Sequence, residues 1–335
     1  MTQNQFVRKD KSLDGNGKFL SRKAETIVFS PWELFMASFR AGLLRVVLRL
    51  FVRAKWQEDL DINHIRRVVG RVDSLFKHTP RGVDVTDIDA NGVPCQWITT
   101  HSGETNRVLY YIHGGAFSIH MPRTYAHFAA EMGRLLHARV LLVDYRLAPE
   151  HPFPAAPQDC LSVYRWLLQQ PGVEPGRVVI AGDSAGGNLT LVTMLMAKEA
   201  GVPLPAAAWA MSPGVNCNFF DEGVLHPDEV DPMFTHQALH MMSDYFGDSD
   251  RNDWRLSPVF GDLEGLPPIL IEAGEREMLR NQPGLFAVPA RAAGVEVQDK
   301  IWRGLVHVFQ IFRFLPEARL ARNQAAKFLA SHMSH

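Results

Sequence analysis

The sequence of 335 residues contains only three cysteines, Cys95, Cys160 and Cys217, which are far apart. No two of them form a CxxC pair, which argues against a zinc knuckle or a redox-active dithiol. We expect three reduced, mostly buried thiols. The sequence also lacks any run of about 18 or more apolar residues, so no membrane-spanning helix is predicted. Neither sign of charge dominates, because 35 basic residues balance 36 acidic ones, whereas nucleic-acid-binding proteins usually have a clear basic excess.

The first 18 residues are polar and have no apolar stretch typical of a secretion signal. A cytoplasmic protein is therefore expected. Hydrophobic residues make up 46% of the chain and aromatic residues 10%, which is enough for a sizeable core.

From residue 83 onward, short β-rich runs alternate with helical segments, a pattern typical of the α/β class with a mostly parallel sheet flanked by helices. Asn91-Gly92 separates the first two runs and indicates a hairpin, so this edge of the sheet should be antiparallel. The eight predicted strands are Val83–Ile88, Pro94–Thr99, Val108–His113, Val140–Tyr145, Val178–Gly182, Ala206–Met211, Ile269–Ala273 and Glu296–Trp302.

A serine in a G-x-S-x-G motif stands between a predicted strand and a predicted helix, in the run Gly182-Asp183-Ser184-Ala185-Gly186. Such a tight turn exposes the serine hydroxyl at the carboxyl edge of the sheet, and the helix behind it directs N–H groups at developing negative charge. The flanking glycines leave room for the turn. Ser184 is therefore the predicted nucleophile.

A nucleophilic serine needs a base, and in this fold class the partners follow in the order serine, acid, histidine. His307 comes just after the last predicted strand and is the predicted base. Glu275 and Glu277 both follow the preceding strand and compete for the role of the acid. At the end of the third predicted strand, Gly114 and Gly115 are candidate oxyanion donors.

The Ala185 amide, directly after the serine, completes the predicted oxyanion hole with the two glycines. Together these motifs resemble the bacterial hormone-sensitive lipase family (family IV esterases) of the α/β-hydrolases, which is related to arylacetamide deacetylase. The likeness runs from about Val108 to Phe309 and rests on YYIHGGAF, DYRLAPEHPFPAAPQD, GDSAGGN, LSPVFGDLEGLPPILIEAG and GLVHVF.

The resemblance implies a carboxylesterase with an α/β-hydrolase fold, an eight-stranded sheet and a helical cap. It assigns Ser184 as nucleophile, His307 as base and Glu277 as acid, although the family usually has aspartate at the position of Glu277. The implied substrates are short- to medium-chain acyl esters, hydrolysed through an acyl-serine without metal or organic cofactor. Expected boundaries are 1–75 for an N-terminal segment and cap helices, 76–215 and 251–335 for the catalytic domain, and 216–250 for a second cap insertion.

Other functions stay open at this point. The same acyl-enzyme route would serve an amidase or deacetylase. A receptor-like homologue without catalysis is a further alternative, which the presence of His307 disfavours. Neither the sequence nor the resemblance decides whether the chain forms a homodimer.

Two local patterns have competing interpretations. A basic helix over residues 40–53, within a longer helix predicted from Ser30 to Trp56, would suit contact with an anionic membrane or a cap over the active site. His236 and His240 have the spacing of a helical metal pair, but no third ligand accompanies them, so exposed cap histidines are expected.

Overall fold

One eight-stranded sheet organises the chain, in the order β1-β2-β4-β3-β5-β6-β7-β8. The computed structural model describes residues 37–55, 61–76, 79–101 and 106–334. The strands are β1 (Val83–Ala90), β2 (Val93–Thr100), β3 (Val108–Ile112), β4 (Arg139–Val143), β5 (Val178–Asp183), β6 (Ala207–Met211), β7 (Ile269–Arg276) and β8 (Val297–Val306). The pairs β1–β2 and β2–β4 are antiparallel and all others are parallel. The predicted sheet is therefore confirmed.

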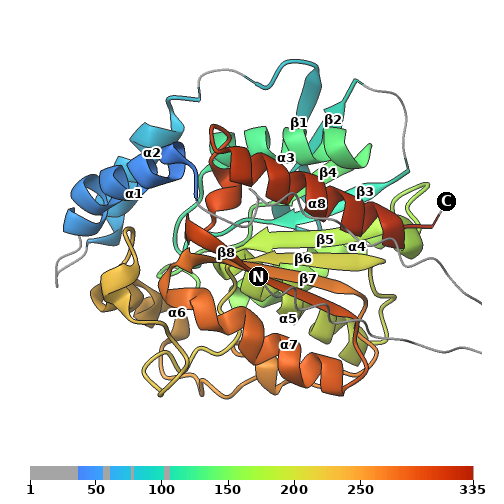
Figure 1. Ribbon diagram of the computed structural model, residues 1–335. Coiled ribbons are helices and arrows are strands. Elements are labelled where there is room, and N and C mark those ends of the chain that lie inside the picture. Colours follow the sequence, from blue (N-terminus) through green and yellow to red (C-terminus); the bar gives the residue numbers. More distant parts are fainter. Residues whose placement is uncertain (1–36, 56–60, 77–78, 102–105, 335) are drawn as a thin grey trace, which may run out of the picture. The chain divides into compact units, whose positions relative to one another are not determined.

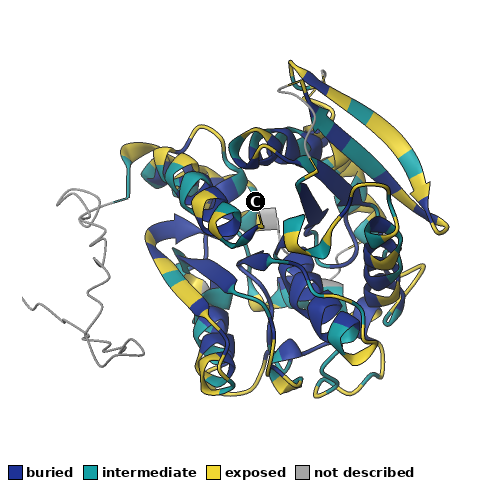
Figure 2. Cartoon of the chain, turned by 90° about the vertical axis from the view of Figure 1, so that its right-hand side faces the viewer, coloured by how far each residue is buried: buried dark blue, intermediate teal, exposed yellow. Residues whose placement is uncertain are grey.

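The antiparallel edge begins with the predicted hairpin. Asn91 and Gly92 both have positive φ angles, 58° and 84°, which suit the tight two-residue turn between β1 and β2. On β1, the outer strand of this hairpin, the residues between the two buried ends are exposed or partly exposed, as Figure 2 shows.

Helices cover both faces of the parallel part of the sheet (Figure 1). The α-helices are α1 (Phe39–Phe51), α2 (Ile62–Asp73), α3 (Pro122–Leu136), α4 (Ala155–Leu168), α5 (Ala185–Glu199), α6 (Ser243–Phe246), α7 (Gln282–Ala292) and α8 (Pro316–His332). Short 3-10 helices are Arg53–Lys55, Pro175–Arg177, Asp228–Val230, His236–Met242, Pro258–Phe260, Met278–Asn281 and Phe309–Ile311.

Alternate side chains of each central strand enter different cores, because successive residues of a strand point to opposite faces. On β3, Leu109 and Tyr111 join a cluster with residues of α3 and α8. Tyr110 and Ile112 join the cluster that contains residues of α4, α5 and α7. Every residue of β3 is therefore buried, as expected for an inner strand of a covered parallel sheet.

The first described helix begins later than the sequence predicted. The Ser38 hydroxyl accepts a hydrogen bond from the Ala41 amide and caps α1, whereas Ser30 lies outside the described residues. Ala41, Leu44 and Leu48 form the buried side of the helix. They pack in a third cluster with residues of β8 and α8.

Three arginines of the first helical region bind carbonyl oxygens of the protein itself. Arg40 donates to Phe314 O, and Arg45 donates to Gly304 O at 2.8 Å. Arg53, just beyond the helix, donates to Asp231 O at 2.8 Å. These bonds hold the helical region to the rest of the protein, and they leave the membrane interpretation a prediction, because a guanidinium group bonded to a neutral carbonyl keeps its charge.

Within residues 216–250, the segment that contains His236 and His240 is a 3-10 helix over His236–Met242, followed by α6. In a 3-10 helix, residues four apart differ by a third of a turn, so His236 and His240 do not share a face. This geometry contradicts the spacing argument for a metal pair. No helix in the described ranges is long and apolar enough to span a membrane. The three cysteines are free and buried, as predicted.

Candidate active site

The functional residues predicted from the sequence lie at the carboxyl ends of neighbouring strands. Gly114 follows the end of β3, Ser184 directly follows β5, Glu277 follows β7 and His307 follows β8. These strands are parallel neighbours, separated only by β6, whose next residue is Ser212. Because parallel strands end at the same edge of a sheet, this order gathers the side chains at one rim.

Ser184 has the strained backbone of a nucleophile elbow. Its φ is 52° and its ψ is −118°, a region that a residue with a side chain rarely occupies. A Cβ atom on Gly182 would lie 2.3 Å from Gly186 O, and one on Gly186 would lie 2.1 Å from Ile112 O. The turn is therefore too tight for side chains at these two positions, as the motif predicted.

His307 and Glu277 lie beside each other, and both are buried. Arg276 and Val306, the last residues of β7 and β8, are paired with each other. Glu277 and His307 directly follow them in the chain. His307 Nδ1 lies 3.2 Å from Glu277 Oε2. The contact is at ion-pair distance but is not aligned as a full hydrogen bond, as is common before substrate binds. Glu277 is fully buried.

The competing carboxylate has a different partner. Glu275 Oε2 accepts a hydrogen bond from the Gly304 amide at 2.9 Å and lies 3.8 Å from Arg276 Nε. Its side chain is about one-third exposed, at 30%. The geometry thus favours Glu277 over Glu275 as the carboxylate that orients His307.

Ser212 connects the acid to the histidine loop. Its hydroxyl donates to Glu277 Oε2 at 2.9 Å and accepts from the Val308 amide at 3.1 Å. The side chain is fully buried. The sequence reasoning did not single out this serine, although its place directly after β6, between the strands of nucleophile and acid, was a usable signal.

Several buried carboxylates act on His307. Burial by itself would lower the pKa of this imidazole, but the carboxylates of Glu277, Asp231 and Asp183 outweigh burial and raise it above its ordinary value. Burial also raises the pKa values of Asp183 and Asp231 themselves. His307 therefore lies among buried carboxylates that favour its protonated form.

The structure corrects the assignment of Gly114 as an oxyanion donor. Its amide donates to Asp183 Oδ1 at 3.0 Å and to Tyr125 Oη at 3.1 Å. Asp183 also accepts hydrogen bonds from the Tyr111 and Tyr125 hydroxyls, at 2.7 Å and 3.0 Å. Asp183 thus accepts the hydrogen bond of the Gly114 amide and connects the loop after β3 to the turn at Ser184.

The next two backbone amides of this loop, those of Gly115 and Ala116, unlike that of Gly114, have no hydrogen-bond acceptor among the described residues. Gly115 has a φ of 117°, and a Cβ atom there would lie 2.0 Å from Ile119 O, so only glycine fits. Ala185 opens α5, where the first N–H groups have no acceptor within the helix. The sequence did not predict Ala116, because it replaces a glycine of the family motif.

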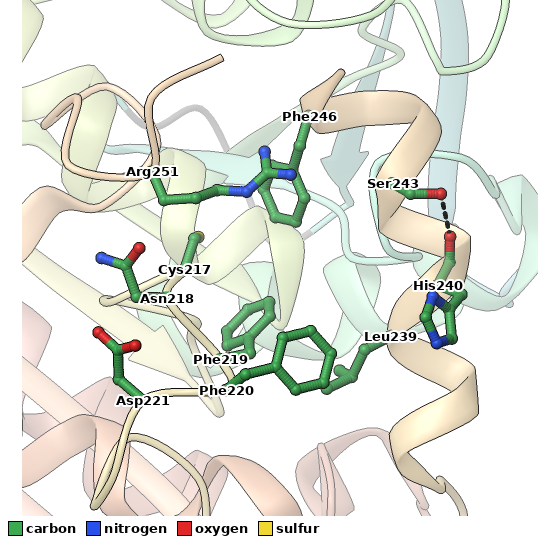
Figure 3. A pocket seen from close by; sticks show the side chains of 10 residues that line it. All are labelled: Cys217, Asn218, Phe219, Phe220, Asp221, Leu239, His240, Ser243, Phe246 and Arg251. Atoms are coloured by element: carbon green, nitrogen blue, oxygen red, sulfur yellow. Dashed lines mark hydrogen bonds between the residues drawn. The ribbon is translucent and has the colours of Figure 1, made fainter. Parts of the chain in front are cut away.

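An aromatic pocket of about 250 Å³ lies between residues 217–221 and the segment that ends in α6 (Figure 3). Phe219 and Phe246 form part of its wall, and the Arg251 guanidinium lies 4.1 Å from the centre of the Phe246 ring. Phe246 also contacts Phe117, which follows the oxyanion loop. The triad candidates do not line this pocket.

One group of potential metal ligands, His113, His120 and Asp144, brings its ligand atoms within 4.8 Å of one another. The two imidazoles stack, with centroids 4.1 Å apart and planes at 12°. Lone pairs in stacked rings run side by side and do not converge on one ion. Each Nδ1 already has a partner, Gly114 O for His113 and Asp144 Oδ1 for His120. The geometry therefore does not fit a metal centre.

Comparisons with known proteins agree with this fold. Residues 109–311 match the family model described as alpha/beta hydrolase fold. A solved esterase from the bacterial hormone-sensitive lipase family superposes with a TM-score of 0.82 at 30% identity, covering 90% of this chain and 100% of that one. The protein is thus an α/β hydrolase.

Two curated relatives narrow the class. An esterase of Acinetobacter venetianus is 33% identical over 291 residues, covering 85% of this chain and 94% of that protein. An acetyl-hydrolase of Streptomyces hygroscopicus is 36% identical over 238 residues, covering 70% and 78%. Because the solved esterase of the bacterial hormone-sensitive lipase family is 30% identical and covers 90% of this chain, the chain belongs to that family within the α/β hydrolases.

Proposed function

We propose that this protein is a carboxylesterase that hydrolyses short- to medium-chain acyl esters through an acyl-serine intermediate, with Ser184, His307 and Glu277 as its triad. The observation that carries the proposal is the buried His307–Glu277 pair at two strand ends, on the sheet edge where the strained Ser184 turn also lies. The relatives named as esterases and acetyl-hydrolases support the substrate class.

In the first half-reaction, Ser184 Oγ attacks the ester carbonyl carbon while His307 Nε2 takes the hydroxyl proton. The carbonyl oxygen becomes an oxyanion, which accepts hydrogen bonds from the amides of Gly115, Ala116 and Ala185. The carbon–oxygen bond to the alcohol then breaks. The alcohol leaves with the proton that His307 returns, and the acyl group stays on the serine.

In the second half-reaction, His307 removes a proton from water, whose oxygen attacks the acyl-serine carbonyl. Collapse of the second oxyanion releases the carboxylic acid and restores the Ser184 hydroxyl with the proton from His307. Throughout, the Glu277 carboxylate fixes the imidazole tautomer and stabilises the imidazolium without taking the proton.

The test is to measure hydrolysis of p-nitrophenyl butyrate by the wild type and by Ser184→Ala. We expect the variant to lose on the order of 10⁴-fold or more in kcat, because the acyl-enzyme route is removed. Esterase activity that survived this substitution would show the mechanism to be wrong. A rate series from p-nitrophenyl acetate to palmitate would test the chain-length range.

A further inference from the structure

Asp231, in the cap insertion, is a buried carboxylate that the mechanism above does not use. Its side chain is only 1% exposed. Oδ1 accepts hydrogen bonds from the amides of Met233 and Phe234, at 2.7 Å and 3.1 Å, which closes a turn within its own segment. Oδ2 is directed elsewhere and accepts from the Met278 amide at 2.9 Å.

Met278 is the residue directly after the triad acid, so this last bond crosses from the cap insertion to the acid loop. A second bond runs in the opposite sense, because the His226 amide donates to Met278 O at 2.8 Å. Both polar groups of the Met278 backbone are therefore held by the cap insertion. Glu277, fully buried beside it, depends on this backbone for the position of its carboxylate.

The segment of residues 231–234 also contacts His307. The Phe234 ring meets the His307 imidazole edge to face, with centroids 5.2 Å apart and planes at 81°. Arg53 donates to the carbonyl oxygens of both Asp231 and Phe234. The N-terminal helical region thus fixes the two ends of a four-residue turn that touches the base with one residue and the acid loop with another.

We propose that Asp231 is a positioning residue of the esterase, which holds the backbone at Met278 so that the Glu277 carboxylate stays at His307. The inference rests on the proposed function and adds a role for the cap insertion. When the cap insertion packs on the core, it would both cover the site and position the Glu277 carboxylate relative to His307. Glutamate needs such restraint more than aspartate does, because its side chain has one more rotatable bond.

The first variant to measure is Asp231→Asn. Asparagine keeps the size and one oxygen, but its amide nitrogen would face an N–H donor on one of its two sides. We expect kcat for p-nitrophenyl butyrate to fall on the order of 10–100-fold with a much smaller change in KM, because a displaced acid impairs proton transfer rather than substrate binding. An unchanged kcat in the folded variant would overturn the proposal.

A matched control is Asp73→Asn. Asp73 is also buried, and its carboxylate accepts from the Arg123 and Thr124 amides at the start of α3. Both variants lose a buried carboxylate that holds backbone amides, so their melting temperatures should fall together. Only the variant at Asp231 should lose kcat. An equal loss of kcat in both would assign Asp231 to stability alone.

A double-mutant cycle separates positioning from general structural support. If Asp231 acts through Glu277, adding Asp231→Asn to Glu277→Gln should cost little further activity, because residues that act as a unit are not additive. The same fold-loss in both backgrounds would overturn the proposal. Should Asp231→Asn not fold, Asp231→Ser replaces it, since its hydroxyl can still close the local turn but is too short to reach Met278.

Ser184→Ala, measured in the same assay, keeps the two hypotheses apart. Full activity in that variant would refute the proposed esterase mechanism, and the role of Asp231 with it. Loss of activity there, together with a wild-type kcat for Asp231→Asn, would leave the mechanism standing and refute only the role of Asp231.

Discussion

The Ser212 hydroxyl donates a hydrogen bond to Glu277 Oε2 at 2.9 Å, on the same oxygen that lies 3.2 Å from His307 Nδ1. One carboxylate oxygen therefore serves both the base and a neighbouring serine, while Oε1 has no partner among the described residues. Glu277 is thus held at both ends, by a hydroxyl at its tip and by the acid loop at its base.

Ser212→Ala should lower kcat by about 10–100-fold, the cost of losing one hydrogen bond to a charged group, because the carboxylate becomes free to rotate away from His307. Steady-state kinetics with p-nitrophenyl butyrate measure the effect. Ser257→Ala is the matched control, since Ser257 is also fully buried and accepts from the Cys217 amide without contacting the triad candidates. Equal losses of kcat in both variants would contradict a role for Ser212 at Glu277.

The choice between the two glutamates gives a second prediction. Glu277→Gln should lower kcat on the order of 10⁴-fold, because an amide can no longer hold the required imidazole tautomer. Glu275→Gln should leave kcat close to that of the wild type, since glutamine keeps an oxygen that can accept from the Gly304 amide. A larger loss at Glu275 than at Glu277 would reverse the assignment of the acid.

The sequence predicted the sheet well because its signals are local. Each strand carries a short β-rich run, and Asn91-Gly92 encodes the tight turn between β1 and β2. The places of Ser184 and His307 followed from the same reasoning, since each comes directly after a strand, whereas the choice of Glu277 over Glu275 came from the family resemblance. Chain order and strand ends are sufficient to gather residues at one rim of a parallel sheet.

The sequence-based prediction was wrong where a residue's hydrogen bonds are made to a segment far away in the sequence. Gly114 was a reasonable oxyanion donor by motif, but its N–H bonds to Asp183, which is 69 positions away. The bond between Asp231 and the Met278 amide likewise joins segments that are 47 positions apart. Such pairings have no local pattern, so a single sequence could not reveal them.

The carboxylates around His307 predict a pH dependence. Because its pKa is raised above the ordinary 6.5, more of the histidine is protonated at a given pH, and only the neutral form can act as a base. The acidic limb of kcat/KM should therefore have its midpoint above pH 6.5. Removing the charge in Glu277→Gln should move that midpoint to lower pH. A midpoint below 6.5 in the wild type, or a shift upward in the variant, would contradict this account.

The oxyanion loop gives the last prediction, at Gly115. In Gly115→Ala, the new Cβ would lie 2.0 Å from Ile119 O at a φ of 117°, so the backbone must move and take its donor amides with it. We expect kcat to fall on the order of 100–1,000-fold, the usual cost of losing an oxyanion donor, with a smaller effect on KM. The measurement is again steady-state hydrolysis of p-nitrophenyl butyrate.

Gly172→Ala separates this effect from ordinary backbone strain. Gly172 also has a positive φ, 74°, but a Cβ atom there would meet nothing within 4 Å. Its substitution should lower the melting temperature slightly and leave kcat unchanged, because the strain is remote from the site. If Gly115→Ala behaved like Gly172→Ala, the loop at residues 114–116 would not supply the oxyanion donors, and stabilisation would have to come from the Ala185 amide at the start of α5.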